Sequence, residues 1–462
     1  MASAQFTAEE LRIATGGSWL NGQAPTGKWQ INTDSRTIRA GECFIPIVGE
    51  RFDGHDFLKS LPDGVTALAE YGRSCPENLM VLQVKNTTEA YQNIARFHRL
   101  RMKQLKVAAV TGSVGKTSVK EMLRAIFNAA VGEDAVLYTI GNTNNQIGVP
   151  QNLLRLTTDI RYAVIEMGTN HHGEIAPLSQ TALPDGAIIN TIAPCHLENL
   201  GSLDGVAQEK SAIYSAMTSP DAVAVYPAEC AGKTIIETAA EKFRHVTFGE
   251  TANADVYAEY ISGSLDGSTV KLVFRDSGKS VTFSWTLSGR HQAVNAAAAA
   301  ALAYSMNIAP EVIACGLSNT SLPGKRMDSV TINGTTWIND AYNANPQSMK
   351  SSLAGIAENC SKTAPLLLVL GDMLELGDDE TAYHREVLEF VQTAFRDHNF
   401  KLCLLGKRFN AAAQDNTLQL SNVQCFDDLD SLTKTLRELR TPGMTIFLKS
   451  SNSIGLSKVE PC

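Results

Sequence analysis

Residues 107–118 read VAAVTGSVGKTS, in which a short apolar run passes into a turn of small residues and then into helix-forming sequence. Glycines in such a turn let backbone N–H groups point at phosphate oxygens, and the following helix presents its positive end. Lys116 can reach the β- and γ-phosphates, and the Thr117 hydroxyl can bind Mg²⁺. The sequence therefore predicts a site for ATP or GTP formed by Thr111, Gly112, Ser113, Val114, Gly115, Lys116, Thr117 and Ser118.

The loop departs from the usual pattern G-x-x-x-x-G-K-[ST], because Val110 stands where the first glycine is expected. It reads G-x-x-G-K-T instead. The alternative is an ordinary glycine-containing turn between a strand and a helix. That alternative does not require Gly115, Lys116 and Thr117 in succession directly after an apolar strand, so we interpret the segment as a phosphate loop.

Length and charge narrow the class of protein. A chain of 462 residues exceeds what one hydrophobic core usually supports, which predicts about three domains. Lys and Arg number 40 against 48 Asp and Glu, the formal charge is −8, and basic residues form no run. We therefore expect an enzyme of several domains that does not bind nucleic acid.

The sequence also predicts a cytoplasmic protein without membrane insertion. Apolar stretches stay well below the roughly 20 residues that a spanning helix needs, and residues 1–7 lack a basic start followed by an apolar core. The nine cysteines include no C-x-x-C pair. Reduced, mostly buried thiols are expected rather than a disulfide framework or a zinc site.

Periodicity divides the chain into three α/β units. Short mixed segments up to residue 86 predict a small α/β domain, and helical sequence over 88–103 leads into the phosphate-loop strand. Apolar runs at 163–166, 186–190 and 222–226 alternate with helical sequence, which favours a doubly wound, mainly parallel sheet. A hairpin is predicted from 270–274 and 281–285, and an alanine-rich helix from 292–304.

A third α/β unit follows a hinge-like segment at 322–326, with strands predicted at 335–340, 366–370, 402–405 and 445–449. The predicted domains are 1–86, 87–321 and 322–462. Binding loops are expected where strands of such sheets end.

Several polar residues follow predicted strands of the middle unit. Glu166 closes an apolar strand and is well placed to hold Mg²⁺ directly or through water, although a solvated or ion-paired acid is the alternative. His196 can ligate a metal or transfer a proton, or it can be a hydrogen-bonded structural histidine. For Lys210 the residues alone favour an exposed helix lysine paired with an acid such as Glu209.

Amide-rich segments suggest contacts with a polar ligand. Asn142 and Asn145 lie in a loop that suits a sugar or phosphate, although asparagine is also a common turn residue. His291 and Asn295 are four apart on one helix face, where both can reach a nucleotide base. Asp340 ends a strand and can grip ribose hydroxyls, while Arg326 at the hinge can meet phosphate or base from the other side, so ATP is expected between two domains.

The chain resembles the Mur ligases, ATP-dependent amide-forming enzymes of peptidoglycan assembly, over essentially its whole length. The resemblance rests on TGSVGKTS, GNTNNQIGVP, AVIEMGTNHHGEI, NTIAPCHLENLGSLDGVAQEKSAIY, LSGRHQAVNAAAA, LPGKRMDSV, DAYNANPQSM and LGDMLELG, in this order. The family's own phosphate loop has the form TGxxGKT, which accounts for the missing glycine. The resemblance implies an N-terminal domain for the UDP end of the substrate, a central ATPase and a C-terminal Rossmann-like domain.

Residue roles follow from the resemblance. It implies that Lys116, Lys210 and His196 are catalytic, that Thr117, Glu166, His196 and Lys210 serve Mg²⁺ sites, and that Asn295, Arg326 and Asp340 hold ATP. Lys210 matches a position that the family carries as a carbamylated lysine, which requires a neutral amine. The residues expected to contact the UDP end or the peptide and dipeptide are Asp34, Ser35, Arg36, Gly49, Asp53, His55, Asn142, Asn145, Asn343, Asn345, Asp372 and Glu375.

The motifs EMGTNHHGEI, DAYNANPQSM and GDMLELG imply a particular activity, the joining of D-alanyl-D-alanine to UDP-N-acetylmuramoyl-tripeptide through an acyl phosphate, by a monomer that uses ATP and Mg²⁺. The alternatives are a sibling ligase that adds the third amino acid, a folate polyglutamylating enzyme with a related core, and a nucleotide-controlled binding protein. Residues 449–453, KSSNS, replace the family's KGSRS-like segment, so the family's dipeptide contacts there do not transfer directly.

Overall fold

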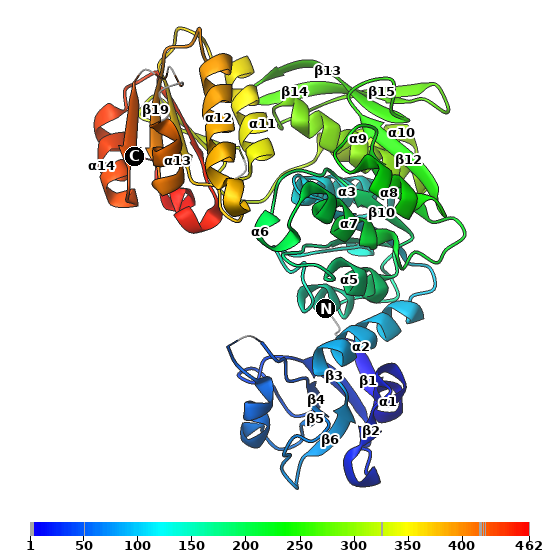
Figure 1. The fold of residues 1–462 in the computed structure, drawn as a ribbon. Coiled ribbons are helices and arrows are strands. Elements are labelled where there is room, and N and C mark those ends of the chain that lie inside the picture. The colour runs from blue at the N-terminus through cyan, green and yellow to red at the C-terminus, as the bar shows by residue number, and fades with distance from the viewer. Residues whose placement is uncertain are drawn as a thin grey trace.

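The described residues form three separate sheets, which a ribbon of the computed structural model shows as three bodies along the chain (Figure 1). The structure describes residues 4–49, 51–324, 327–414, 418, 420 and 422–461. Strands of the first sheet lie between residues 5 and 84, those of the second between 106 and 285, and those of the third between 328 and 449. The predicted α/β class is confirmed.

The N-terminal sheet has a parallel centre and antiparallel edges. Its order is β1-β3-β4-β5-β6-β2, in which β3 to β6 run parallel and β1 and β2 pair antiparallel at the two edges. The strands are β1 (Gln5–Thr7), β2 (Ser18–Trp19), β3 (Lys28–Asn32), β4 (Glu42–Phe44), β5 (Thr66–Glu70) and β6 (Met80–Val84). Helix α1 (Ala8–Thr15) begins with a capping box between Thr7 and Glu10, which satisfies amides of its first turn.

Helix α2 (Thr87–Arg101) joins the first body to the second, close to the predicted span of 88–103. It packs on α1 on one side and on α4 (Gly148–Leu153) and α5 (Ile175–Ala182) on the other. Buried side chains of the N-terminal sheet, of α2 and of one face of the middle sheet form one continuous apolar core. This shared core attaches the N-terminal body to the middle body.

The middle sheet is mainly parallel, as predicted. Its order is β15-β14-β13-β12-β11-β10-β7-β9-β8, and among the described strands β14 alone runs against its neighbours, pairing antiparallel with β13 and with β15. The strands are β7 (Lys106–Thr111), β8 (Val136–Tyr138), β9 (Tyr162–Glu166), β10 (Gly186–Ile189), β11 (Val223–Pro227), β12 (Arg244–Gly249), β13 (Val256–Ser264), β14 (Gly267–Phe274) and β15 (Lys279–Trp285). The predicted hairpin is confirmed as β14–β15.

Alternate residues of the middle strands enter two different cores, because successive side chains of a strand point to opposite faces. Val107 and Ala109 of β7 belong to the core that α2, α4 and α5 cover. Ala108 and Val110 belong to the core under α3 (Lys116–Val131), α9 (Arg290–Ser305) and α10 (Pro310–Ser318). Both faces are therefore covered by helices, which explains why the strands read as continuous apolar runs.

Helix α9 confirms the predicted alanine-rich helix, with bounds close to the expected 292–304. Its alanines from Ala296 to Ala301 are fully buried. Small side chains let this helix approach α3 and the strands β11 to β13. The first turn of α9 is thereby fixed beside the phosphate loop.

The C-terminal sheet has the order β16-β17-β21-β18-β19-β20 and is parallel except for β16. Its strands are β16 (Asp328–Ile332), β17 (Thr335–Asn339), β18 (Leu366–Gly371), β19 (Phe400–Leu405), β20 (Val423–Phe426) and β21 (Thr445–Lys449). Helices α11 (Pro346–Asn359) and α12 (Glu380–Ala394) cover one face, and α14 (Leu429–Leu439) covers the other. The edge strands β16 and β20 were not predicted.

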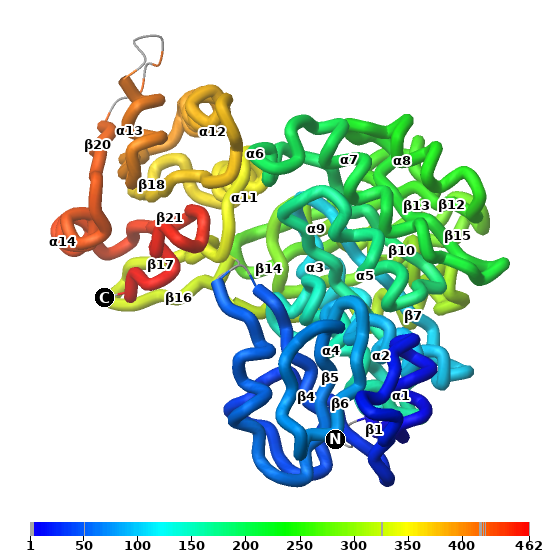
Figure 2. Tube along the Cα trace, turned by 60° about the horizontal axis from the view of Figure 1, so that its bottom comes forward, coloured from blue at the N-terminus to red at the C-terminus, as the bar shows by residue number. Residues whose placement is uncertain are grey.

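The C-terminal body sits beside the middle body, with α11 and the short α6 (Leu197–Leu200) close to their junction in both views (Figure 2). The N-terminal body projects from another side of the middle body (Figure 1). In the part of the chain that the structure describes, no helix combines the length and apolarity needed to cross a membrane.

Candidate active site

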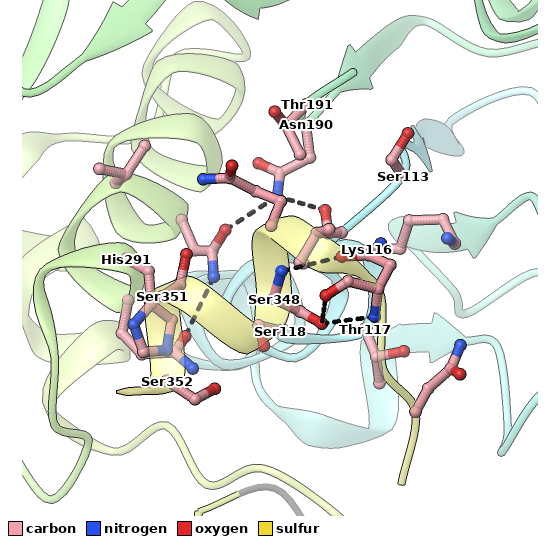
Figure 3. Close-up of a pocket in the computed structure, with 18 of the residues that line it drawn as sticks. Ser113, Lys116, Thr117, Ser118, Asn190, Thr191, His291, Ser348, Ser351 and Ser352 are labelled. Carbon is pink, nitrogen blue, oxygen red and sulfur yellow. Dashed lines mark hydrogen bonds between the residues drawn. The ribbon is translucent and has the colours of Figure 1, made fainter. Parts of the chain in front are cut away.

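A cleft of about 1010 Å³ lies where the middle and C-terminal bodies meet. One wall is formed by the phosphate loop and the first two turns of α9, and the other by the segment after β17 and the length of α11. Figure 3 shows Lys116 and Thr117 in the same cleft as His291 of α9 and Ser348 and Ser352 of α11. The cleft is therefore bounded by segments more than two hundred residues apart in sequence.

The phosphate loop joins β7 to α3, as predicted from the sequence, and its glycines are sterically required. Gly115 has φ +79°, and a Cβ there would lie 2.1 Å from Asn190 Nδ2 and 2.6 Å from Asn295 Oδ1. Lys116 Nζ donates to Gly112 O at 2.7 Å, so the lysine crosses its own loop. This close packing leaves no room for a side chain at position 115.

Asn190 supports the phosphate loop and was not predicted from the sequence as a site residue. Its Nδ2 donates to Val114 O and to Asn295 Oδ1, both at 2.8 Å. Asn295, in turn, donates to Gln292 Oε1 at 3.1 Å, so the predicted nucleotide contact also supports the loop. The only signal for Asn190 is that an amide closes the fully buried strand β10.

Glu166 and Thr117 meet at one end of the cleft. Glu166 ends β9, is 3% exposed, and accepts hydrogen bonds from Thr117 Oγ1 at 3.1 Å and from Asn144 Nδ2 at 2.9 Å. A hydroxyl and a carboxylate are the hard oxygen donors that suit Mg²⁺. The described residues hold no group of three or more His, Cys, Asp and Glu suited to a metal. The donor set nevertheless fits Mg²⁺, because this ion retains several waters and takes further oxygens from phosphates.

His196 lines the cleft and contacts the C-terminal body. Its Nδ1 lies 2.5 Å from Glu375 Oε2, and Leu197 N donates to Glu375 O at 3.1 Å. Both His196 and Glu375 have positive φ, +51° and +63°. The histidine lowers the pKa of the Glu375 carboxyl through this contact. Glu375 thus approaches His196 from outside the cleft lining.

Lys210 on α7 (Leu203–Ser211) is buried, at 1% exposure, so its interpretation as an exposed helix lysine is wrong. Its supposed partner Glu209 instead accepts backbone hydrogen bonds from Gly173, Glu174 and Ile175. Desolvation lowers the pKa of Lys210 to about 8, and the nearby Lys116 ammonium adds to the effect, while Cys195 and Glu209 oppose it. The amine is therefore far easier to deprotonate than that of an ordinary lysine.

The C-terminal wall contains three of the predicted residues, Asp340, Asn343 and Asn345. Asn345 caps α11 by accepting from Ser348 N at 2.8 Å. Asp340 accepts from Ser352 Oγ at 2.6 Å and from Lys449 Nζ at 2.5 Å. Lys449 was noted in the sequence only as part of a divergent segment. Arg326, predicted to contact ATP, lies outside the described residues.

Asn142 and Asn145 line the cleft beside the phosphate loop. Asn145 Oδ1 also accepts from Gly148 N at 2.9 Å, at the start of α4. Asp372 lies elsewhere, because its carboxylate accepts from Arg408 N at 3.1 Å and from Phe409 N at 2.9 Å. It is 2% exposed and caps α13 (Lys407–Ala413), which gives it a structural role and no place in the cleft lining.

The remaining predicted residues lie on the N-terminal body, apart from the cleft. Arg36 pairs with Asp34 at 2.8 Å, and its hydrogen bonds lower the pKa of Asp34 to about 2. Asp53 lies 2.6 Å from His55 Nδ1 and 2.7 Å from Arg73. These two local clusters lie in the loops after β3 and β4, and the cleft lining does not include the residues predicted there, Asp34, Ser35, Arg36, Gly49, Asp53 and His55.

Comparison with known proteins gives consistent matches along the chain. Residues 110–303 match the Mur ligase middle domain, and residues 325–452 match the Mur ligase glutamate ligase domain. The UDP-N-acetylmuramoyl-tripeptide--D-alanyl-D-alanine ligase of Bacillus subtilis is 34% identical over 433 residues, covering 93% of this chain and 92% of the relative. The enzyme of the same name from Escherichia coli is also 34% identical, with the same coverage.

A solved structure of MurF from Acinetobacter baumannii superposes with a TM-score of 0.89 at 30% identity, covering 99% of this chain and 98% of that one. The MurF ligase of Thermotoga maritima, solved in complex with ADP, matches with a TM-score of 0.79 at 22% identity, covering 93% of this chain and 95% of the other. The three-body arrangement is thus a known one.

Proposed function

Because this chain belongs to the Mur ligase family, we propose that it joins D-alanyl-D-alanine to UDP-N-acetylmuramoyl-tripeptide and consumes ATP in doing so. The product is the UDP-N-acetylmuramoyl-pentapeptide precursor of peptidoglycan. The observation that carries the proposal is the cleft itself, in which the phosphate loop of one body opposes Asp340, Asn343 and Asn345 of another. The names of relatives that match over nine-tenths of the chain supply the identity of the substrates.

The chemistry requires an activated carboxyl group. Transfer of the γ-phosphoryl group of ATP to the tripeptide carboxylate gives an acyl phosphate and ADP. The amine of D-alanyl-D-alanine then attacks the acyl carbon, and phosphate leaves from the tetrahedral intermediate. Negative charge develops in both steps, and in this proposal Lys116 and the amides of its loop stabilise it.

Thr117 and Glu166 are the residues that would hold Mg²⁺, and His196 is a further residue of the same cleft lining. When bound, the ion supplies charge neutralisation at the phosphates. Lys210 supports the expectation of a carbamate, since burial leaves its amine partly neutral near pH 8. The C-terminal body, which contacts α6 through Glu375, would exclude water from the acyl phosphate.

We further propose that the N-terminal body receives the UDP end, through Asp34, Ser35, Arg36 and the loop from Gly49 to His55. The domain limits are proposed at 86/87 and 321/322, in the segments between successive sheets. A monomeric, cytoplasmic enzyme is part of the same proposal.

Phosphate release from the purified protein with Mg-ATP tests the reaction. The assay is run with UDP-N-acetylmuramoyl-tripeptide containing lysine or diaminopimelate, with and without D-alanyl-D-alanine, and the pentapeptide product is detected by mass. We expect phosphate release and product only when the dipeptide is present. ATP hydrolysis that is independent of D-alanyl-D-alanine and gives no product would favour a nucleotide-controlled switch. Activity only with UDP-N-acetylmuramoyl-dipeptide and a free amino acid would favour a sibling ligase.

A further inference from the structure

Lys449, the last residue of β21, is a buried cation in the cleft, with 3% of its surface exposed. Its ammonium lies 2.5 Å from Asp340 Oδ2 and also donates to Asp340 O and Asn343 O, both at 3.3 Å. An ammonium has three donors and no acceptor. These hydrogen bonds of Lys449 therefore all go to one segment, residues 340–343. The ion pair with Asp340 offsets the free-energy cost of burying the ammonium charge.

The position of this pair is set by sheet topology. Strand β21 lies beside β17, with Leu448 opposite Asn339, so Lys449 and Asp340 follow at the carboxyl ends of adjacent parallel strands. That edge of an open α/β sheet is where ligands bind. Lys449 thus acts on the stretch that supplies Asp340, Asn343 and Asn345 to the cleft.

The two oxygens of Asp340 have different surroundings. Oδ2 accepts hydrogen bonds from Lys449 Nζ and from Ser352 Oγ, whereas Oδ1 accepts no hydrogen bond from the described part of the chain. A carboxylate oxygen of this kind can accept from the two hydroxyls of a ribose. A buried carboxylate would also repel a triphosphate, and the ammonium beside it cancels that charge.

His291 of the middle body faces the same pair. Burial lowers its pKa to about 4, with Asp340 opposing the shift and Lys449 adding to it. The imidazole is therefore neutral near pH 7. The Asp340–Lys449 pair with its neutral neighbour His291 adds no net charge to the cleft.

We propose that Lys449 is a positioning residue for the nucleotide, which holds Asp340 so that Oδ1 stays available to the ribose and which neutralises the carboxylate against the phosphates. The inference rests on the proposed function and on the expectation from the sequence that Asp340 holds ATP. Lys449 acts through Asp340 and does not touch the reacting atoms.

A double-mutant cycle tests this role, using the ATP KM and kcat of the ligation reaction and the affinity for ADP measured by calorimetry. The variants are K449M, D340N and D340N/K449M, and K401M is the control, an exposed lysine on β19 of the same sheet. We expect K449M to raise the ATP KM about tenfold or more while kcat changes less than about threefold. The double variant should bind ADP as D340N does, because Lys449 has no effect once the carboxylate is removed.

Two results would overturn the role. Effects of K449M and D340N that multiply in the double variant would mean that Lys449 does not work through Asp340, and an unchanged ATP KM in folded K449M would mean that it does not serve the nucleotide. If K449M does not fold, judged by circular dichroism, S352A takes its place. This variant removes the second donor to Oδ2 and keeps both charges, and we expect an ATP KM raised roughly threefold. Absence of ligation by the wild-type protein would instead reject the proposed function itself.

Discussion

Lys116 and Lys210 show how surroundings give one side chain two kinds of chemistry. Lys116 lies on the cleft wall and bonds to its own loop at Gly112 O, so its charge can be directed at a phosphate. Lys210 is enclosed by protein, and desolvation lowers its pKa to about 8. The sequence identifies both as lysines near motifs, and only the surroundings separate a phosphate-binding cation from an amine that can be neutral.

Replacing Lys116 by alanine should lower the rate of ligation by roughly a hundredfold or more without unfolding the protein. The change removes one positive charge from the phosphate loop, and loss of one such donor costs about 10²–10³ in kcat. Phosphate release measures the activity, and the thermal midpoint by circular dichroism checks the fold. The exposed Lys242, changed to alanine, is the matched control in the middle body. Normal turnover by the folded Lys116→Ala variant would reject the phosphate-loop assignment.

Lys210 predicts an unusual pH dependence of stability. The amine has a pKa of about 8 in the folded protein and 10.5 as its ordinary value, so between these pH values the unfolded chain binds more protons. The contribution of Lys210 to the free energy of unfolding therefore rises with pH across this window. Below a pH of about 8 the cost of burying the charged amine is fully present. In CO₂-free buffer, Lys210→Met should be more stable than wild type at pH 7, on the order of 3 kcal/mol.

The measurement is urea unfolding of both proteins at a series of pH values from 7 to about 10.5. The advantage of Lys210→Met should shrink steadily above pH 8. A difference that stays constant over the series would show that the lysine is not buried as a cation below pH 8.

At the scale of elements, the shape of the phosphate loop between β7 and α3 depends on its contacts with the end of β10 and with α9. Gly115 has positive φ and lies against Asn190, which follows β10, and Asn295 of α9. The loop is thus shaped by neighbours from distant parts of the chain as well as by its own glycines. A turn with the same local sequence but other neighbours would not have this shape.

Gly115→Ala should therefore lose nucleotide binding because the new methyl group collides with its neighbours. A control variant at another glycine with positive φ separates this collision from backbone strain. The new Cβ would lie 2.1 Å from Asn190 Nδ2, in addition to the cost of a positive φ. Gly72→Ala is the control, because Gly72 has φ +84° and a methyl group there would meet nothing within 4 Å. Calorimetry with ADP should show binding by Gly72→Ala only, and equal affinity of both variants would contradict the role of the contact.

For the molecule as a whole, the contact between His196 and Glu375 joins two bodies. It pairs residues that both have positive φ, and backbone strain of this kind costs of order 1–3 kcal/mol each. A second contact, Arg290 Nε to Glu358 Oε1 at 3.3 Å, joins the same bodies from α9 to α11. These two polar contacts join the bodies together with Leu265, between β13 and β14, which packs against the apolar core of the C-terminal body.

Glu375→Ala should loosen the C-terminal body. Removal of the carboxylate leaves His196 without its contact, so small-angle X-ray scattering should show a larger radius of gyration and maximum dimension than wild type. Asp378→Ala, which removes an exposed acid three residues away, is the control and should scatter as wild type does. Superimposable curves for Glu375→Ala and wild type would mean that this contact does not hold the bodies together.

The features that could be predicted from the sequence are local and periodic. The order of strand, small-residue loop and helix at residues 106–131, the β14–β15 hairpin and the alanine-rich α9 follow from runs of neighbouring residues, and the structure confirms them. The edge strands β16 and β20 escaped prediction because most of their side chains are exposed or only partly buried, so no alternating apolar pattern marks them.

Which polar groups are enclosed, and which residues they contact, depends on the packing of the whole chain. Lys210 is buried rather than exposed, and Asp372 caps α13 rather than lining the cleft. Lys449 forms an ion pair with Asp340, which lies 109 residues earlier in the chain. Burial and pairing depend on residues that folding brings together from distant positions, and a side chain's charge and pKa depend on that enclosure. A motif therefore identifies a functional residue, whereas its chemical state is set by the packed molecule.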